Sequence, residues 1–257
     1  FEYQGSQTAV ATYDFTFENE LTTVELSKAD LTTGEELPGA ILRVIDENGS
    51  LVDEWVSSTE PHKITGLTVG ESYTMVETKP ADGYATAESI SFTVENTVEI
   101  QKHEMLDDVT KVEISKTDIT GEQEVPGAKL TITDKEGNTV ASWTSGEVPY
   151  YVEKLPVGTY ILREEQAPEG YVIAEEITFE VEDTEKIQKV TMKDDTAKGK
   201  VTIIKTDKDS KSPLKGVEFE LRDKKGKVLE TLVTDADGRA ESSLYEIATY
   251  KDGVYQK

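Results

Sequence analysis

Three kinds of ionisable residue each end a row of apolar side chains in this sequence. In the stretch YILREE, an extended chain places Tyr160, Leu162 and Glu164 on one face, because the side chains of a strand alternate between its two faces. The same alternation places Lys116 in line with the apolar residues just before it, and it does the same for Asp194. An earlier stretch of the chain repeats the pattern with Lys28, Glu77 and Asp107.

A lysine, a glutamate and an aspartate that meet on an apolar face can form a covalent bond. Burial disfavours the charged forms, so it lowers the pKa of an amine and raises the pKa of a carboxyl group. A neutral amine held against a protonated carboxyl group can attack it, and a second carboxyl group can carry the proton. The product is an amide, formed with loss of one water. Two other interpretations stay open, namely a plain buried salt bridge and strand ends whose charges reach water.

These residues recur because the chain contains a domain-sized internal repeat. The stretch VELSKADLTTGEELPGA returns 88 residues later as VEISKTDITGEQEVPGA, and more loosely as VTIIKTDKDSKSPLKGV. The glutamate boxes YTMVETKPADGY and YILREEQAPEGY also correspond. We therefore predict complete repeats at 21–108 and 109–195, and an incomplete third repeat at 196–257. We expect a fragment of a longer protein, in which 1–20 holds the closing strand of a preceding repeat.

Within a repeat the pattern is that of short β-strands. Runs of five to eight residues, rich in Val, Ile, Thr and Tyr, are separated by turn signals such as ENGS and KEGN. No segment shows a sustained apolar period of 3.6 residues. Several short strands in about 90 residues favour a small β-sandwich, so we predict an all-β tandem array of such domains. The stretch DADGR is predicted to be a β-turn, because it lacks the rest of a calcium-binding loop.

The composition excludes several classes of function. Of the 257 residues, 52 are acidic and 27 are basic, and the net charge of −25 opposes binding to nucleic acid or to an anionic membrane. There is no cysteine, and the two histidines are His62 and His103. Thiol catalysis, a histidine-based triad and cysteine-ligated zinc therefore lack their residues, and we expect no metal and no cofactor. No apolar run is long enough to span a bilayer, so we expect no membrane insertion of this segment.

At these residues the chain resembles the B-type repeat domains of Gram-positive surface proteins, which include collagen-adhesin B domains and SpaA-type pilin domains. The resemblance rests on the SKAD and SKTD lysines, the glutamate boxes, and the closing EMLDD and TMKDD strands, which occur in this order twice. It implies a prealbumin-like (Ig-like) β-sandwich for each repeat and spontaneous isopeptide bonds within the repeats. The implied bonds are Lys28–Asp107, promoted by Glu77, and Lys116–Asp194, promoted by Glu164, with Lys205 of the third repeat and Asn19 of the preceding one as unpaired crosslink candidates.

The resemblance also implies a function. The chain is expected to be a stalk segment of an adhesin or pilin-like protein, extracellular and attached to the cell wall through an anchor outside this sequence. Its expected partners are neighbouring repeats and, through an adhesive tip outside this sequence, a host surface ligand; we expect a monomer. The alternative is a module that binds a host protein or glycan through loops, with Trp143, Tyr150 and Tyr151 as a candidate patch, although packing explains these residues more simply. Self-crosslinking in a single turnover is the only reaction expected, so the chain is not expected to be an enzyme.

Overall fold

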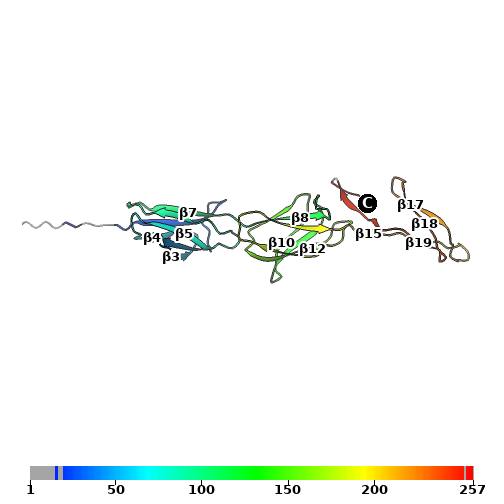
Figure 1. Cartoon of the computed structure of the whole chain (residues 1–257), viewed down its shortest axis with the longest axis horizontal. Helices are drawn as coiled ribbons and strands as arrows, with labels where there is room; N and C mark the ends of the chain where they lie inside the picture. Colours follow the sequence, from blue (N-terminus) through cyan, green and yellow to red (C-terminus); the bar gives the residue numbers. More distant parts are fainter. Residues whose placement is uncertain (1–14, 17–19, 252, 257) are drawn as a thin grey trace, which may run out of the picture. The chain divides into compact units, whose positions relative to one another are not determined.

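The computed structural model describes residues 15–16, 20–251 and 253–256 of the chain (Figure 1). Every regular element among these residues is a β-strand, and none of them forms a helix that could cross a membrane. The all-β fold class expected from the sequence is therefore confirmed. Contacts within the chain define two units. Unit 1 contains strands β1–β7, and unit 2 contains residues 82–85 together with strands β8–β22.

Unit 1 is built from two sheets. Strand β1 is the central strand of the first sheet, antiparallel to β4 on one side and parallel to β7 on the other. The second sheet has the order β3-β2-β5-β6, and all of its pairs are antiparallel. The strands are β1 (Thr23–Asp30), β2 (Ile41–Asp46), β3 (Leu51–Val56), β4 (His62–Thr65), β5 (Ser72–Lys79), β6 (Ile90–Thr93) and β7 (Gln101–Asp107).

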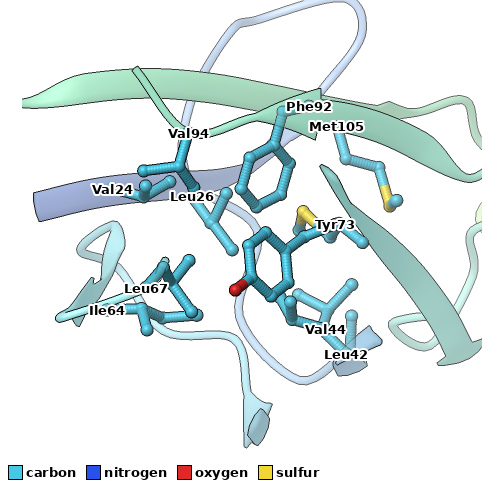
Figure 2. Close-up of a cluster of buried hydrophobic side chains, with 12 residues drawn as sticks. Val24, Leu26, Leu42, Val44, Ile64, Leu67, Tyr73, Phe92, Val94 and Met105 are labelled. Atoms are coloured by element: carbon cyan, nitrogen blue, oxygen red, sulfur yellow. The ribbon is translucent and has the colours of Figure 1, made fainter. Parts of the chain in front are cut away.

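The apolar faces of these two sheets pack on each other and form the core of unit 1. Val24 and Leu26 of β1 lie across the core from Leu42 of β2 and Tyr73 of β5, and Met105 of β7 joins the same cluster (Figure 2). Each buried side chain of this size stabilises the fold by about 1.5–3 kcal/mol. The register of β1, β5 and β7 is therefore set by burial, because a shift of one residue would turn the apolar row outward.

Strands β8–β14 of unit 2 repeat this topology. Strand β8 is antiparallel to β11 and parallel to β14, and the second sheet has the order β10-β9-β12-β13. Ile114, Leu130, Leu162 and Met192 are among the buried residues that form its core. The strands are β8 (Lys111–Asp118), β9 (Lys129–Asp134), β10 (Thr139–Thr144), β11 (Tyr150–Glu153), β12 (Gly158–Gln166), β13 (Ile177–Val181) and β14 (Gln188–Asp194).

The remaining strands of unit 2 are short and are paired two by two. The antiparallel pairs are β15 with β20, β16 with β19, β17 with β18 and β21 with β22. Leu232 and Ala240 are buried in this part of the unit. The strands are β15 (Lys198–Gly199), β16 (Thr202–Ile204), β17 (Glu218–Arg222), β18 (Val228–Val233), β19 (Arg239–Glu241), β20 (Tyr245–Glu246), β21 (Thr249–Lys251) and β22 (Val254–Gln256).

Candidate functional site

The interior of unit 1 contains a lysine and two carboxyl groups in contact. Lys28 is 1% exposed, although lysine is among the residues that are least often buried. Its Nζ lies 3.1 Å from Oε1 of Glu77 and contacts Oδ1 of Asp107. Both carboxyl groups are also buried. The structure therefore brings together the three residues of the predicted trio, which come from strands β1, β5 and β7.

The interior of the β8–β14 sandwich contains the same arrangement. Lys116 is 1% exposed, its Nζ lies 3.2 Å from Oε1 of Glu164, and it contacts Oδ1 of Asp194. These residues come from β8, β12 and β14, the counterparts of the three strands that supply the first trio.

Strand pairing explains why the aspartate reaches the lysine. In unit 1, the parallel register of β1 and β7 pairs Lys28 with Met105, and the inward-facing residue two positions after Met105 is Asp107. Asp107 is fully buried, and the neighbouring Asp108 is only half-buried, as the alternation of side chains predicts. Glu77 enters from the opposite sheet, where it ends the buried row of β5.

Backbone groups hold the glutamates in place. The backbone N–H of Ala87 donates a hydrogen bond of 2.7 Å to Oε2 of Glu77, which leaves Oε1 directed at the lysine. In the second trio Ala174 donates in the same way to Glu164, also at 2.7 Å. Sequence reasoning missed these donors, because a backbone N–H in a loop leaves no residue-type signal.

A further pair of glutamates next to the lysines was also missed. Glu36 accepts a hydrogen bond from the backbone N–H of Lys28 at 3.3 Å, and Glu124 accepts one from Lys116 at 2.8 Å. Both lie directly before the LPGA or VPGA turn of the repeated motif. A glutamate at the same position of both copies of the motif was the sequence signal that could have identified them. They touch the lysine backbone, so they position the strand and lie outside the contact between the reacting groups.

The electrostatics of each trio raise the pKa of its aspartate. Burial raises the pKa of Asp107 to about 7; the Lys28 ammonium opposes this rise, and the neighbouring Glu77 carboxylate adds to it. Burial likewise raises the pKa of Asp194 to about 6, with the same two opposing influences from Lys116 and Glu164. The Oδ2 atoms of both aspartates are buried and receive no hydrogen bond from the residues that the structure describes. Each trio thus holds an amine against a carboxyl group that is readily protonated.

The other candidate residues lie elsewhere. Lys205 is half-buried directly after β16, and its carbonyl oxygen accepts a hydrogen bond from Leu214, as that of Lys28 does from Leu37. Asn19 lies outside the described residues, as does most of the segment 1–20.

The aromatic patch considered as a binding site is partly occupied by its own packing. Trp143 packs against the core of the β8–β14 sandwich and stacks on Tyr150, with ring centroids 4.4 Å apart. The hydroxyl of Tyr151 donates to Glu113 at 2.6 Å. Trp55 stacks on His62 in the same way in unit 1, with centroids 4.2 Å apart. The stacked rings cover each other's faces, so these faces are not free to stack on a sugar or on another aromatic group.

The chain is similar to solved structures of proteins from two Bacillus species. Among solved structures, the chain is similar to the Bacillus anthracis TIE protein, with 26% identity and a TM-score of 0.59; the match covers 87% of this chain and 43% of that chain. The chain therefore spans less than half of the TIE protein. It is more distantly similar to BcpA, the major pilin subunit of Bacillus cereus, with 17% identity, a TM-score of 0.48, and coverage of 92% of this chain and 91% of that chain. No curated protein matches the chain.

A family profile matches the chain three times in tandem. The profile is that of the SpaA prealbumin-like fold domain, and it matches residues 22–108, 110–196 and 199–251. The first two matches contain the two sandwiches with their buried trios, and the third contains strands β16–β21. Since these matches extend over most of its length, the chain belongs to the SpaA prealbumin-like fold domain family.

Proposed function

We propose that the chain is a structural stalk segment of a Gram-positive cell-surface protein, an adhesin or a pilin-like protein. It is stiffened by isopeptide bonds that form spontaneously from its own residues. The bonds join Lys28 to Asp107 and Lys116 to Asp194. The proposal includes the division into repeats at 21–108, 109–195 and 196–257, an extracellular location, and attachment to the cell wall outside this sequence. The observation that carries it is the burial of a complete Lys–Glu–Asp trio inside each sandwich.

The reaction is a condensation between two side chains. A proton passes from the Lys28 ammonium to the Asp107 carboxylate, which gives a neutral amine and a carboxylic acid. Nζ then attacks Cγ, and one C–O bond breaks. The departing hydroxyl group leaves as water with a proton from Nζ, which the Glu77 carboxylate relays from nitrogen to oxygen. The product is one amide, and Glu77 returns to its initial state, so each repeat reacts once.

Burial explains why an amide is favoured over a lasting ion pair. Taking a lysine and two carboxyl groups out of water costs several kcal/mol for each ion, and their mutual attraction offsets this cost only when every polar atom is paired. Oδ2 of Asp107 is buried without a hydrogen-bond donor among the described residues. Condensation expels one of the two aspartate oxygens as water and replaces two charges with a neutral amide, which is less costly to bury.

The position of the bond gives it a mechanical consequence. Lys28 lies in β1 and Asp107 ends β7, and these are the first and last strands of unit 1. A covalent bond between neighbouring parallel strands would carry tension directly from one to the other. Residues 29–106 would then bear no load, so the domain would resist extension even where its hydrogen bonds break. This property suits a stalk, and it requires no cysteine and no oxidising machinery.

Intact mass spectrometry of the purified chain tests the proposal. We expect the mass to be two waters below the sum of the residues, and one water below it in Lys28→Ala and in Lys116→Ala. Lys102→Ala is the matched control, because Lys102 is exposed, pairs with Glu25 at 2.8 Å outside the trio, and its loss should leave both water losses intact. A mass equal to the sequence sum would refute the crosslinks. Each trio would then be a buried salt bridge, and binding to an immobilised host matrix would become the function to test.

A further inference from the structure

A glycine and a tyrosine at the end of the second glutamate box pair with a short stretch of the following chain. Tyr171 forms an antiparallel bridge with Thr196. The backbone N–H of Ala197 donates to the carbonyl oxygen of Gly170 at 2.7 Å, and the carbonyl oxygen of Ala197 accepts from the N–H of Ile247 at 2.9 Å. The stretch 196–197 is therefore hydrogen-bonded on both sides, between the box and the loop after β20.

Side chains reinforce this pairing. Tyr171 and Tyr250 are both buried, and they form a cluster with Val125 and Ala167. The hydroxyl of Tyr171 accepts a hydrogen bond of 3.1 Å from the backbone N–H of Tyr250. The hydroxyl of Tyr250 in turn donates to Glu147 at 2.7 Å. The cluster thus joins residues that precede β14 to residues that follow β20, all within unit 2.

The end of the first glutamate box makes the same backbone contacts within unit 2, with a different side-chain partner for its tyrosine. Tyr84 bridges Val109, and Thr110 donates its backbone N–H to Gly83 at 3.0 Å. The carbonyl oxygen of Thr110 accepts from the N–H of Lys154, which directly follows β11, at 3.1 Å. Nζ of Lys154 donates to the Tyr84 hydroxyl at 2.8 Å and lies 4.9 Å from the centre of its ring. These contacts are why residues 82–85 belong to unit 2.

We propose that the Gly170–Tyr171 pair of the second glutamate box is a docking site for the repeat that follows it. The partner is the loop after β20, and the linker stretch between them, 196–197, is a bridging strand in place of a flexible tether. The box thereby has two roles in one segment. Its glutamate belongs to the trio inside its own repeat, and its glycine and tyrosine bind the next repeat. The proposal does not depend on the isopeptide bonds.

Glycine is required at this site for contact as well as for backbone conformation. Gly170 has φ +86°, and a Cβ there would lie 2.5 Å from Cβ and 2.6 Å from the carbonyl oxygen of Ala248. A Cβ on Gly83, with φ +87°, would lie 2.6 Å from the carbonyl oxygen of Lys154. Gly137 also has φ +87°, but a Cβ there would meet nothing within 4 Å. The backbone strain of an alanine is therefore similar at 137 and at 170. The two positions differ in that a Cβ at 170 would clash with Ala248.

Hydrogen exchange of the full chain tests the docking site. The amides of Ala197, Ile247 and Tyr250 are the reporters, and those of β8 report on the sandwich itself. In Gly170→Ala we expect the reporter amides to exchange at least about tenfold faster, with β8 unchanged, because the added methyl group cannot be placed without separating the box from the loop. Gly137→Ala should leave the reporters as in the parent. Equal reporter exchange in the two variants would overturn the proposal.

A second variant covers the case in which Gly170→Ala disturbs the whole unit and speeds exchange in β8 as well. Tyr171→Phe keeps the ring in the cluster and removes only the hydroxyl that the Tyr250 amide donates to. We expect faster exchange at Tyr250 and no change in β8; an unchanged Tyr250 amide would overturn the proposal. Intact mass measured on the same samples separates this result from the crosslinks, because a lost docking contact should leave both water losses in place.

Discussion

Glu77→Gln should prevent the crosslink in unit 1 while leaving both reacting residues present. The substitution preserves the shape of the side chain and removes the carboxylate that would relay the proton between Lys28 and Asp107. The amide oxygen of the new side chain can still accept the hydrogen bond from Ala87. We therefore expect a chain that lacks one water in place of two, with Lys28 and Asp107 remaining as an ion pair.

The expected loss of stability follows from the loop that the proposed bond would close. The proposed bond would join positions 79 residues apart in sequence. By analogy with disulfides, closing a loop of this length lowers the entropy of the unfolded chain enough to stabilise the fold by about 4.5 kcal/mol. The amide introduced at position 77 adds a second cost of about 1–3 kcal/mol, because its NH₂ group must face either the lysine or a backbone donor. The free energy of unfolding of unit 1 should therefore fall by about 5.5–7.5 kcal/mol in total.

Denaturant unfolding followed by tryptophan fluorescence measures this change. The chain has two tryptophans, Trp55 in unit 1 and Trp143 in unit 2, so a Trp143→Phe background makes Trp55 the reporter of unit 1. The cost of Glu77→Gln in an Asp107→Ala background, where no bond can form and Lys28 is still present, gives the amide contribution alone. The difference between the two costs is the loop-closure contribution. A full loss of two waters in Glu77→Gln would refute the promoter role, and a difference below about 1 kcal/mol would refute the loop-closure reasoning.

Two further predictions concern the aspartate acceptor and the pH dependence of unit 1. Asp107→Asn should crosslink with loss of ammonia, so its intact mass should equal that of the crosslinked parent; a mass one ammonia higher would show that the amide is not attacked. Burial beside Phe92 lowers the pKa of His103 below 6.5, and Glu95 only partly opposes this. The unfolded chain therefore binds a proton that the folded unit resists, and the free energy of unfolding should decrease as the pH falls from about 7 to 5. His103→Val, which copies Val190 of the second repeat, should remove this part of the pH dependence in denaturant unfolding, and an equal dependence in both proteins would contradict the assignment.

The fold class and the contact within each trio could be predicted from the sequence, because both depend on the two-residue alternation of side chains along a strand. Alternation with a period of two residues decides which side chains of a strand face the core, and burial enforces that register. Lys28, Glu77 and Asp107 each end an apolar row, so alternation placed all three on inward faces. The repeat of 88 residues added a second copy with the same parity at Lys116. The pairing of distant strands did not have to be known. It was enough that all inward-facing side chains of one sandwich share the same core.

The groups that hold the trio in place could not be reasoned out in the same way. Ala87 and Ala174 act through backbone N–H groups, which every residue except proline carries, so their types say nothing about the role. The contact between Gly170 and Ala248 joins a turn to a loop far along the chain, and no periodicity connects them. Glycine in that box was equally well explained by the turn alone, since φ there is positive.

The crosslink and the docking site, taken together, would hold the second repeat in two places, at its first and last strands and at the stretch that follows them. A bond between Lys116 and Asp194 would secure the strands β8 and β14, but it ends at Asp194 and leaves the next residues outside the closed loop. After Asp195 come Thr196 and Ala197, which are held by Gly170 and Tyr171 of the same repeat. Under tension the covalent part cannot yield, so the hydrogen-bonded stretch 196–197 is the first part that can. Compared with the crosslinked β8–β14 sandwich, the stretch 196–197 should therefore lengthen at lower force, and Gly170→Ala should lower the force at which it does so.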